Sequence, residues 1–378
     1  MTTRSQCRLP NRARLGAAAL ACALAALPAA GEESRYDKLG SLAEVYSGQP
    51  AGAVRSVRLR GRLQLDQAAV YGNDEKFSDT NLRRFRFGAE IAFRNDIVLA
   101  AEADYDWADG HPVYTRLTEA YVGWQPSKAV NVRAGKHSAP FTLDGMTSST
   151  KLTTIDRSNL ANNIWFTEEY IPGVSVAGDI DKWTYHLGVY SSGERNRGFG
   201  DSNGGEFWLG TVGYDFGTRL KADKALVRLN LVHNDPDARN GFTRPLEDIA
   251  SLTVDLDSGR WGLGADFSSA RGYLGQSDLE AFMVMPRYNF GDALQLVARY
   301  TRVRSDAPNG VRFARYESEV VEGRGDDYRE LYVGLNYYLY GHKLKVQSGL
   351  QYADMNDRVR DGGGYSGWAW TAGLRVSW

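Results

Sequence analysis

The sequence is poor in cysteine and lacks long apolar runs beyond residues 1–31. Its two cysteines, Cys7 and Cys22, both lie close to the N-terminus. The remainder of the chain therefore cannot be a disulfide-stapled secreted domain. No later segment has the roughly 20 consecutive apolar residues that a membrane-spanning helix needs. A barrel strand needs only every second residue to be apolar, so ordinary hydropathy does not exclude a membrane β-barrel.

The chain also lacks an excess of charge of either sign. It has 45 Lys and Arg against 46 Asp and Glu, which gives no reason to expect nucleic acid as a partner. The five histidines are scattered and show neither metal-ligand nor triad spacing, so the sequence predicts no cofactor, no metal site and no catalytic residues. In contrast, 41 glycines and 12% aromatic residues suit many strands and turns better than helices.

A basic stretch opens the chain, with arginines at Arg4, Arg8, Arg12 and Arg14. The apolar sequence LGAAALACALAALPAAG follows it, which is typical of a cleavable secretory signal. We assign this signal peptide to residues 1–31. Its removal takes four arginines away and leaves 41 basic residues against 46 acidic ones, a net charge of about −5. We expect residues 32–54 to be a short periplasmic lead-in and residues 55–378 to form a barrel.

Alternation with a period of two dominates this remainder. In SVRLRGRLQLD, residues 56–66, three arginines stand two positions apart and aliphatic residues fill most of the positions between. Successive side chains of a strand point to opposite faces, so one face is polar and the other apolar. Sixteen such segments follow one another, and short connections such as RND, DIDK and YGH alternate with long ones, the first of them after Gln67. The pattern predicts an all-β transmembrane antiparallel β-barrel of about 16 strands, with tight periplasmic turns and long extracellular loops.

Aromatic residues mark one end of the expected strands. Seven of them lie beside a short turn or at the C-terminus: Phe93, Trp124, Trp183, Phe216, Trp261, Phe290 and Trp378. Such a ring is expected where the outer surface of a barrel meets lipid headgroups, so outer-membrane lipid is an expected partner. The last segment, GWAWTAGLRVSW, is apolar or small at alternate positions and ends on an aromatic residue. It resembles the signal by which outer-membrane barrels are recognised by the barrel assembly machinery.

If the apolar face contacts lipid, the opposite positions line a water-filled interior. The candidate pore-lining and anion-binding residues are the basic residues at these positions: Arg58, Arg60, Arg62, Arg84, Arg86, Arg133, Arg228, Arg299, Lys345 and Arg375. The first five lie on two neighbouring strands and favour an electropositive wall. Such a wall suits carboxylate and phosphate, because a guanidinium group can bond two oxygens at once. The alternative is that they pair with inward-facing acids and select little. Those acids are Asp66, Glu102, Asp104, Asp106, Glu119 and Glu330.

One connection is much longer than the others. Residues 139–173 separate two expected strands, and loops of this length are usually functional or disordered. We expect this third long loop to fold inward and narrow the interior. It would bring four charged residues to the constriction: Asp144, Lys151, Asp156 and Arg157.

Five motifs resemble, in their order and spacing, the phosphate-selective porin O and P family: NLRRFRFGAEIAF, TEAYVGW, VNVRAGKHSAPFTLD, TTIDRSNLAN followed by PGVSVAGD, and LVARYTRV. The resemblance spans most of the chain after the leader. It implies a sixteen-stranded, trimeric porin in the outer membrane of a Gram-negative bacterium, a channel that often prefers anions. The family usually has a lysine near Ser138 and a glutamate where Asp144 and Asp156 stand, so phosphate is one possible solute among several.

Two other classes of function stay open. An outer-membrane barrel enzyme would need a nucleophile and a base that meet on the barrel, and a structural anchor or adhesin would need a domain beyond it. The sixteen expected strands use nearly the whole chain after the leader. We therefore expect a channel and not an enzyme, with small anions or other small hydrophilic solutes passing through it.

Deleting Trp378 should lower the amount of protein in the outer membrane far more than replacing Trp368, because only Trp378 ends the chain. Immunoblots of outer-membrane fractions measure this difference. Equal amounts of the two variants would contradict a terminal-signal role.

Overall fold

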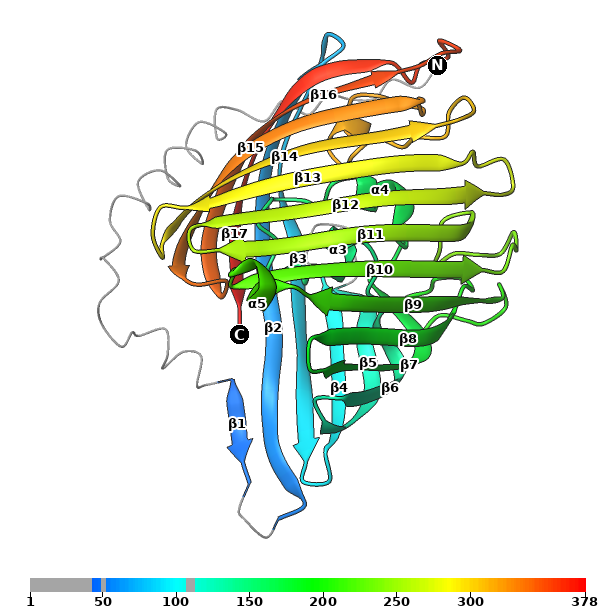
Figure 1. Cartoon of the computed structure of the whole chain (residues 1–378). Helices are drawn as coiled ribbons and strands as arrows, with labels where there is room; N and C mark the ends of the chain where they lie inside the picture. The colour runs from blue at the N-terminus through cyan, green and yellow to red at the C-terminus, as the bar shows by residue number, and fades with distance from the viewer. Residues whose placement is uncertain (1–42, 49–51, 107–112) are drawn as a thin grey trace. The chain divides into compact units, whose positions relative to one another are not determined.

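A closed sheet is the main feature of the computed structural model, which describes residues 43–48, 52–106 and 113–378. The expected signal peptide and part of the lead-in lie outside these residues. Within them, seventeen strands belong to one sheet. Each strand from β2 to β17 pairs antiparallel with the next, and β17 pairs with β2, so sixteen strands close into a barrel (Figure 1). The predicted fold class and strand number are confirmed.

The strand bounds agree closely with the sequence periodicity. The first eight barrel strands are β2 (Val54–Gly72), β3 (Glu75–Phe93), β4 (Ile97–Tyr105), β5 (Tyr114–Ser127), β6 (Val130–Ser138), β7 (Tyr170–Ile180), β8 (Trp183–Ser191) and β9 (Glu206–Asp215). The other eight are β10 (Lys224–Asn234), β11 (Leu246–Ser258), β12 (Trp261–Gly272), β13 (Leu279–Asn289), β14 (Leu294–Ser305), β15 (Asp327–Tyr340), β16 (Leu344–Asn356) and β17 (Tyr365–Ser377).

The remaining elements are short. Strand β1 (Glu44–Ser47) pairs with β2 and is not one of the sixteen barrel strands. The helices are α3 (Leu143–Met146), α4 (Asn159–Ile164), α5 (Gly217–Leu220) and the 3-10 turn η1 (Glu317–Glu319). None of the helices in the described ranges is long and apolar enough to cross a membrane.

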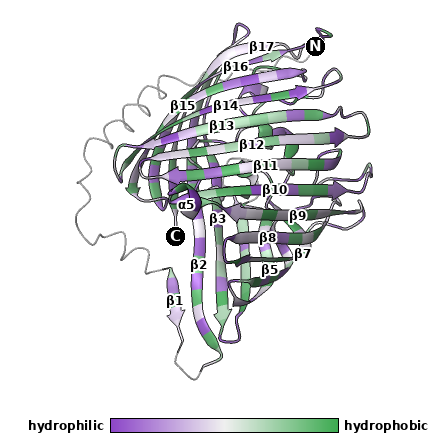
Figure 2. Ribbon diagram, viewed as in Figure 1, coloured by the Kyte–Doolittle hydropathy of each residue, from purple (hydrophilic) through white to green (hydrophobic). Residues whose placement is uncertain are grey.

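Hydrophobic and hydrophilic residues alternate along the strands (Figure 2). In β2, Leu65 is 39% exposed, whereas its neighbours Gln64 and Asp66 are each 1% exposed. Exposed apolar side chains on other strands include Phe87, Leu99, Val122, Leu187, Leu229, Leu252, Leu331 and Leu350. The barrel thus turns apolar side chains outward and polar side chains inward, as lipid contact requires.

The connection between β2 and β3 differs from the sequence prediction. A long loop is expected after Gln67, but the two strands continue to Gly72 and Glu75 and pair along this extension. Asn73 and Asp74 join them with φ values of 51° and 65°. A two-residue hairpin turn of type I′ requires this left-handed region at both positions. The polar side chains at the start of β3, in EKFSDTN, are typical of a loop, but the backbone of this stretch pairs with β2 as a strand.

Aromatic side chains lie beside the short turns as predicted. Trp124, Trp183, Trp261 and Phe290 are 47–64% exposed. Trp183 packs edge-on against Tyr214, with ring centroids 4.9 Å apart. These residues suit the boundary between lipid and headgroups, where an aromatic ring has one apolar side and one hydrated side.

Leu63 faces outward like Leu65, two residues away on β2. Replacing Leu63 with arginine should reduce barrel assembly, because a basic side chain on the lipid face costs about 2–4 kcal/mol at mid-membrane depth. Leu63→Met is the control, since it keeps the outer face apolar. The fraction of protein that migrates as a heat-modifiable band on gels measures assembly, and equal fractions for both variants would mean that the two faces are assigned the wrong way round.

Candidate functional site

Inward-facing side chains of the barrel hold the segment between β6 and β7, residues 139–169. Three of the predicted pore-lining cations donate to its main-chain carbonyls: Lys345 Nζ to Leu152, Arg299 Nη1 to Asp156 at 2.9 Å, and Arg375 Nη2 to Ile155 at 3.2 Å. The three cations are almost fully buried. Their role in the structure is therefore to bind this segment, which leaves them little contact with water.

Short side-chain contacts set the conformation of the segment itself. Thr142 Oγ1 accepts a hydrogen bond from the main-chain N–H of Gly145 and caps α3. Asp144 Oδ2 accepts from the N–H of Ser158 at 2.6 Å, just before α4. Asp144 is 2% exposed, so its carboxylate joins α3 to α4 within the segment.

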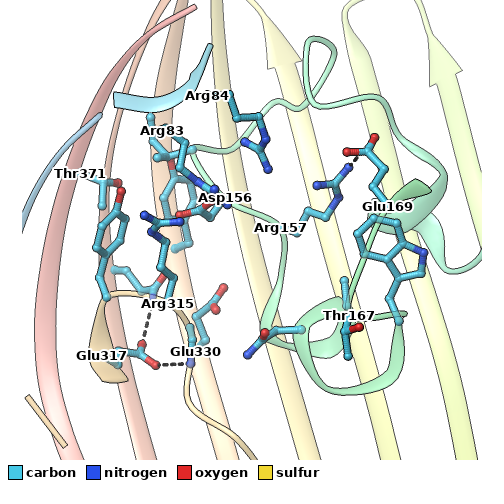
Figure 3. Close-up of a pocket in the computed structure, with 18 of the residues that line it drawn as sticks. Arg83, Arg84, Asp156, Arg157, Thr167, Glu169, Arg315, Glu317, Glu330 and Thr371 are labelled. Carbon is cyan, nitrogen blue, oxygen red and sulfur yellow. Dashed lines mark hydrogen bonds and ion pairs between the residues drawn. The ribbon is translucent and has the colours of Figure 1, made fainter. Parts of the chain in front are cut away.

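The segment and the barrel wall enclose a cavity of about 300 Å³ (Figure 3). Among the residues that the structure describes, eight arginines line it: Arg83, Arg84, Arg86, Arg116, Arg157, Arg244, Arg299 and Arg315. Five acidic residues also line it: Asp156, Glu168, Glu169, Glu317 and Glu330. The cavity wall thus has an excess of three positively charged side chains when all five acids are ionised.

The sequence-predicted residues divide between this cavity and other places. Those that line the cavity are Arg84, Arg86, Asp156, Arg157 and Arg299. Those that do not are Arg58, Arg60, Arg62, Arg133, Asp144, Lys151, Arg228, Lys345 and Arg375. Arg133 lies over the ring of Tyr121, and Arg228 Nη1 lies 3.4 Å from the sulfur of Met146.

Three of the predicted arginines of β2 and β3 have carboxylate partners on β4 and β5. The shortest distances are 2.9 Å from Arg60 to Glu119, 3.4 Å from Arg62 to Glu102 and 2.8 Å from Arg86 to Asp104. For these three, the structure follows the alternative in which inward arginines pair with inward acids. The charge of these paired arginines attracts a passing anion less strongly than an unpaired charge would.

Three other arginines of the cavity have no such partner. Within the described residues, Arg84, Arg244 and Arg315 make no ion pair within 4.0 Å. Arg84 Nη1 donates to Gln64 Oε1 at 2.8 Å, and Arg244 Nη2 donates to the carbonyl of Asn162 at 2.7 Å. Burial, followed by the repulsion of neighbouring arginines, lowers the pKa of Arg244 to about 10. These three side chains therefore border the cavity without a carboxylate in direct contact.

Arg83, Arg116, Arg244 and Arg315 are the cavity arginines that strand alternation misses. Arg116 lies beside a change of register on β5, between the partners of Glu102 and Ala103 of β4. Arg83 is an extra residue in a β-bulge, where the register changes between Gln64 and Leu65 of the paired strand. The bulge breaks the two-residue period, so Arg83 and Arg84 both line the cavity. Arg244 and Arg315 come from loops, for which alternation predicts no orientation.

Two carboxylates of the cavity are held ionised by arginines. Burial raises the pKa of a carboxyl group, but the nearby positive charges outweigh it and lower the pKa of Asp156 and of Glu169 to about 2. The largest such charge is Arg83 for Asp156 and Arg157 for Glu169. Both acids therefore stay negatively charged at neutral pH and neutralise part of the arginine charge.

Glu317, in the loop between β14 and β15, has the opposite environment. It is 1% exposed, and Tyr328 and Gln351 donate hydrogen bonds to its Oε1 at 2.8 and 2.7 Å. Burial and then the charge of Glu330 raise its pKa from 4.5 to about 7. Arg299 pairs with Glu330 at 2.7 Å. In contrast, Glu317 has no arginine within salt-bridge distance in the described structure.

The packing of this loop should weaken as pH rises. The folded protein binds more protons at Glu317 than the unfolded chain, so the stabilisation is fully present below pH 4.5 and is lost as pH rises through about 7. Hydrogen exchange of residues 306–326 should therefore be faster at pH 8 than at pH 5.5, after correction for intrinsic rates. Glu317→Gln should remove most of this difference. An unchanged pH dependence in that variant would mean that another group controls the loop.

Comparisons with known proteins agree with this architecture. The family model described as phosphate-selective porin O and P matches residues 57–276. The comparison with curated proteins found no match. An anion-selective porin from Comamonas acidovorans is 13% identical with a TM-score of 0.59, and the match covers 85% of this chain and 99% of that one. OprB of Pseudomonas putida is 11% identical with a TM-score of 0.61, covering 85% and 94% of the two chains.

A third solved structure is in-vitro folded OmpT of Vibrio cholerae, described as a trimer form. It is 14% identical with a TM-score of 0.50, and the match covers 86% of this chain and 100% of that one. At such low identity, these three likenesses show the fold. The family match extends over more than half of the sequence, from β2 into the loop after β12. The chain therefore belongs to the phosphate-selective porin O and P family and is an outer-membrane porin.

Proposed function

We propose that this porin prefers anions. The observation that carries the proposal is the excess of three positive side chains around the cavity, together with three arginines that no carboxylate pairs with. A charge beside a narrow path attracts counter-ions over about 8 Å at physiological salt, so charges on distant loops matter little. The slightly negative net charge expected of the mature chain is therefore compatible with anion preference.

The chemistry of the arginines without a carboxylate partner favours oxyanions. A guanidinium group donates two parallel hydrogen bonds to a phosphate or carboxylate, which a spherical halide cannot accept in the same way. Arg84 and Arg315 border the same cavity (Figure 3). Phosphate and small carboxylates are thus the solutes we propose, in keeping with the family description.

We further propose that residues 139–169 narrow the channel. Support comes from their hydrogen bonds to Lys345, Arg299 and Arg375, three inward-facing residues on different strands. In the same proposal, residues 1–31 are a cleaved signal peptide, residues 32–54 are a periplasmic lead-in, and residues 55–378 form the barrel.

The expected partners are also part of this proposal. The exposed apolar face supports contact with outer-membrane lipid, and the terminal Trp378 supports recognition by the barrel assembly machinery. A homotrimer is supported by the family resemblance and by the similarity to a trimeric outer-membrane protein. Size-exclusion chromatography with light scattering in detergent tests the trimer.

We propose a channel without catalytic activity. Ser175 Oγ and His137 Nε2 lie 2.8 Å apart, a contact that a serine nucleophile and its base could make. However, His137 Nδ1 lies 2.9 Å from the carbonyl of Gly135 and not beside a carboxylate. His137 is 0% exposed and Ser175 is 4% exposed, so a substrate has no access to the pair. Its role is to join β6 to β7.

Arg84→Gln should lower the ratio of anion to cation permeability about threefold. A unit charge about 6 Å away in water contributes roughly 0.7 kcal/mol, screening at physiological salt reduces this to roughly 0.3 kcal/mol, and the contribution has opposite signs for anions and cations. The reversal potential of the purified channel in a planar bilayer, under a salt gradient, measures this ratio. Arg360→Gln is the matched control, because Arg360 lies in the exposed loop after β16 and does not line the cavity. A wild-type channel that prefers cations would refute the proposed function.

A further inference from the structure

A second loop reaches the cavity beside the segment 139–169. Residues 306–326 connect β14 to β15, and their main chain is held by three asparagine side chains of α4. The contacts are Asn159 Nδ2 to the carbonyl of Arg312 at 2.9 Å, Asn163 Nδ2 to the same carbonyl at 3.1 Å, the N–H of Arg312 to Asn163 Oδ1 at 2.8 Å, and Asn162 Nδ2 to the carbonyl of Phe313 at 2.7 Å. We call these four contacts the asparagine clamp.

The clamp is shielded from water. Asn159 and Asn163 are both 0% exposed. A buried amide that loses its partner destabilises the structure, because neither water nor another group replaces the hydrogen bond. The clamp is therefore expected to keep the two loops in this arrangement.

The same loop is attached again a few residues later. Tyr316 donates from its hydroxyl to Asp66 Oδ2 at 3.1 Å, which ties the loop to β2. Glu317 accepts from Tyr328 of β15 and from Gln351 of β16. Residues on both sides of position 315 are thus fixed, one side to α4 and the other to the barrel wall.

Arg315 lies between these two attachments. Its side chain is exposed, lines the cavity and makes no ion pair within the described structure (Figure 3). The Arg315 charge is close enough to Asp156 to contribute to the low pKa of that carboxyl group. Arg315 therefore presents a positive charge to the cavity from a loop whose main chain is fixed on both sides, and its guanidinium lies over the ring of Tyr316 with Cζ 5.5 Å from the centroid.

We propose that Arg315 is a selectivity-determining residue of the channel and that the asparagine clamp positions it beside the path of the anion. This inference rests on the proposed function and adds to it a residue and a positioning device from a second loop. A long arginine side chain on a mobile loop would spread its charge over a large volume. The clamp concentrates that charge at one place, where it raises the local anion concentration.

The first experiment compares Arg315→Gln with Arg360→Gln in planar bilayers. Arg315→Gln should lower the anion-to-cation permeability ratio about threefold, and Arg360→Gln should leave it unchanged. An unchanged ratio for Arg315→Gln, in a wild-type channel that prefers anions, would overturn the proposal.

The second experiment tests the clamp through non-additivity. Arg315→Gln is added to a channel in which Asn159→Ala and Asn163→Ala remove three of the four clamp contacts. If the clamp positions Arg315, the glutamine substitution should have little further effect in this background. A full threefold effect there would refute the positioning role. Heat-modifiable migration confirms that the clamp variant still forms a barrel before its currents are compared.

The third experiment separates this inference from the proposed anion preference. The chain has no cysteine after Cys22, so Arg315→Cys introduces a single thiol into the barrel. A negatively charged thiol reagent should reduce the anion current through this variant in steps, and should leave Arg360→Cys unaffected. Stepwise loss of current in a channel without anion preference would support the position of residue 315 and refute the proposed function. No response to the reagent would place Arg315 away from the path and overturn the inference alone.

Discussion

Hydrocarbon offers no hydrogen-bond partner to an exposed peptide group, so strands can cross a membrane only as a sheet without open edges. The pairing of β17 with β2, from Gly367 opposite Gly72 to Ser377 opposite Arg62, meets this requirement. Once the sheet is closed, alternate side chains of each strand must face either lipid or the interior, and a shift by one residue would exchange the two sets. The inward arginines and the loops that they bind depend on this closure.

Closure also brings together charges that are remote in the sequence. An inward-facing charge that is withdrawn from water destabilises the barrel unless a partner compensates it. Arg60, Arg62 and Arg86 meet this requirement with carboxylates of β4 and β5. Arg299 meets it with Glu330 and the main-chain carbonyl of Asp156. Arg375 meets it with Asp66 and three main-chain carbonyls, one of them that of Ile155. Arg299 and Arg375 hold the segment 139–169 against the barrel wall through these hydrogen bonds. The contacts that compensate their charge therefore also position the loop.

The unpaired arginines have a different origin. Arg84 stands next to a β-bulge, and Arg244 and Arg315 are on loops. Strand pairing places Asp104 opposite Arg86, and the two form an ion pair. A bulge or a loop does not by itself leave an arginine unpaired, because Arg83 of the bulge pairs with Asp156 and Arg157 of a loop pairs with Glu169. Among the cavity arginines of the described structure, Arg84, Arg244 and Arg315 are those without a carboxylate within 4.0 Å.

The sequence by itself determined the sixteen strands, the inward and outward faces and the turn side of the barrel, because each depends on side chains within about ten residues of one another. It also predicted charged residues for the interior, of which Arg84, Arg86 and Arg299 line the cavity from the strands. It did not determine which of those charges are neutralised: Arg375 binds Asp66, a residue at the opposite end of the chain. Nor could it place Arg83, where a bulge breaks the period of two, or Arg315, on a loop whose main chain at Arg312 is bound by asparagines of another loop. Only the tertiary structure decided these points, because pairing of charges and docking of loops depend on contacts between segments that no local period relates.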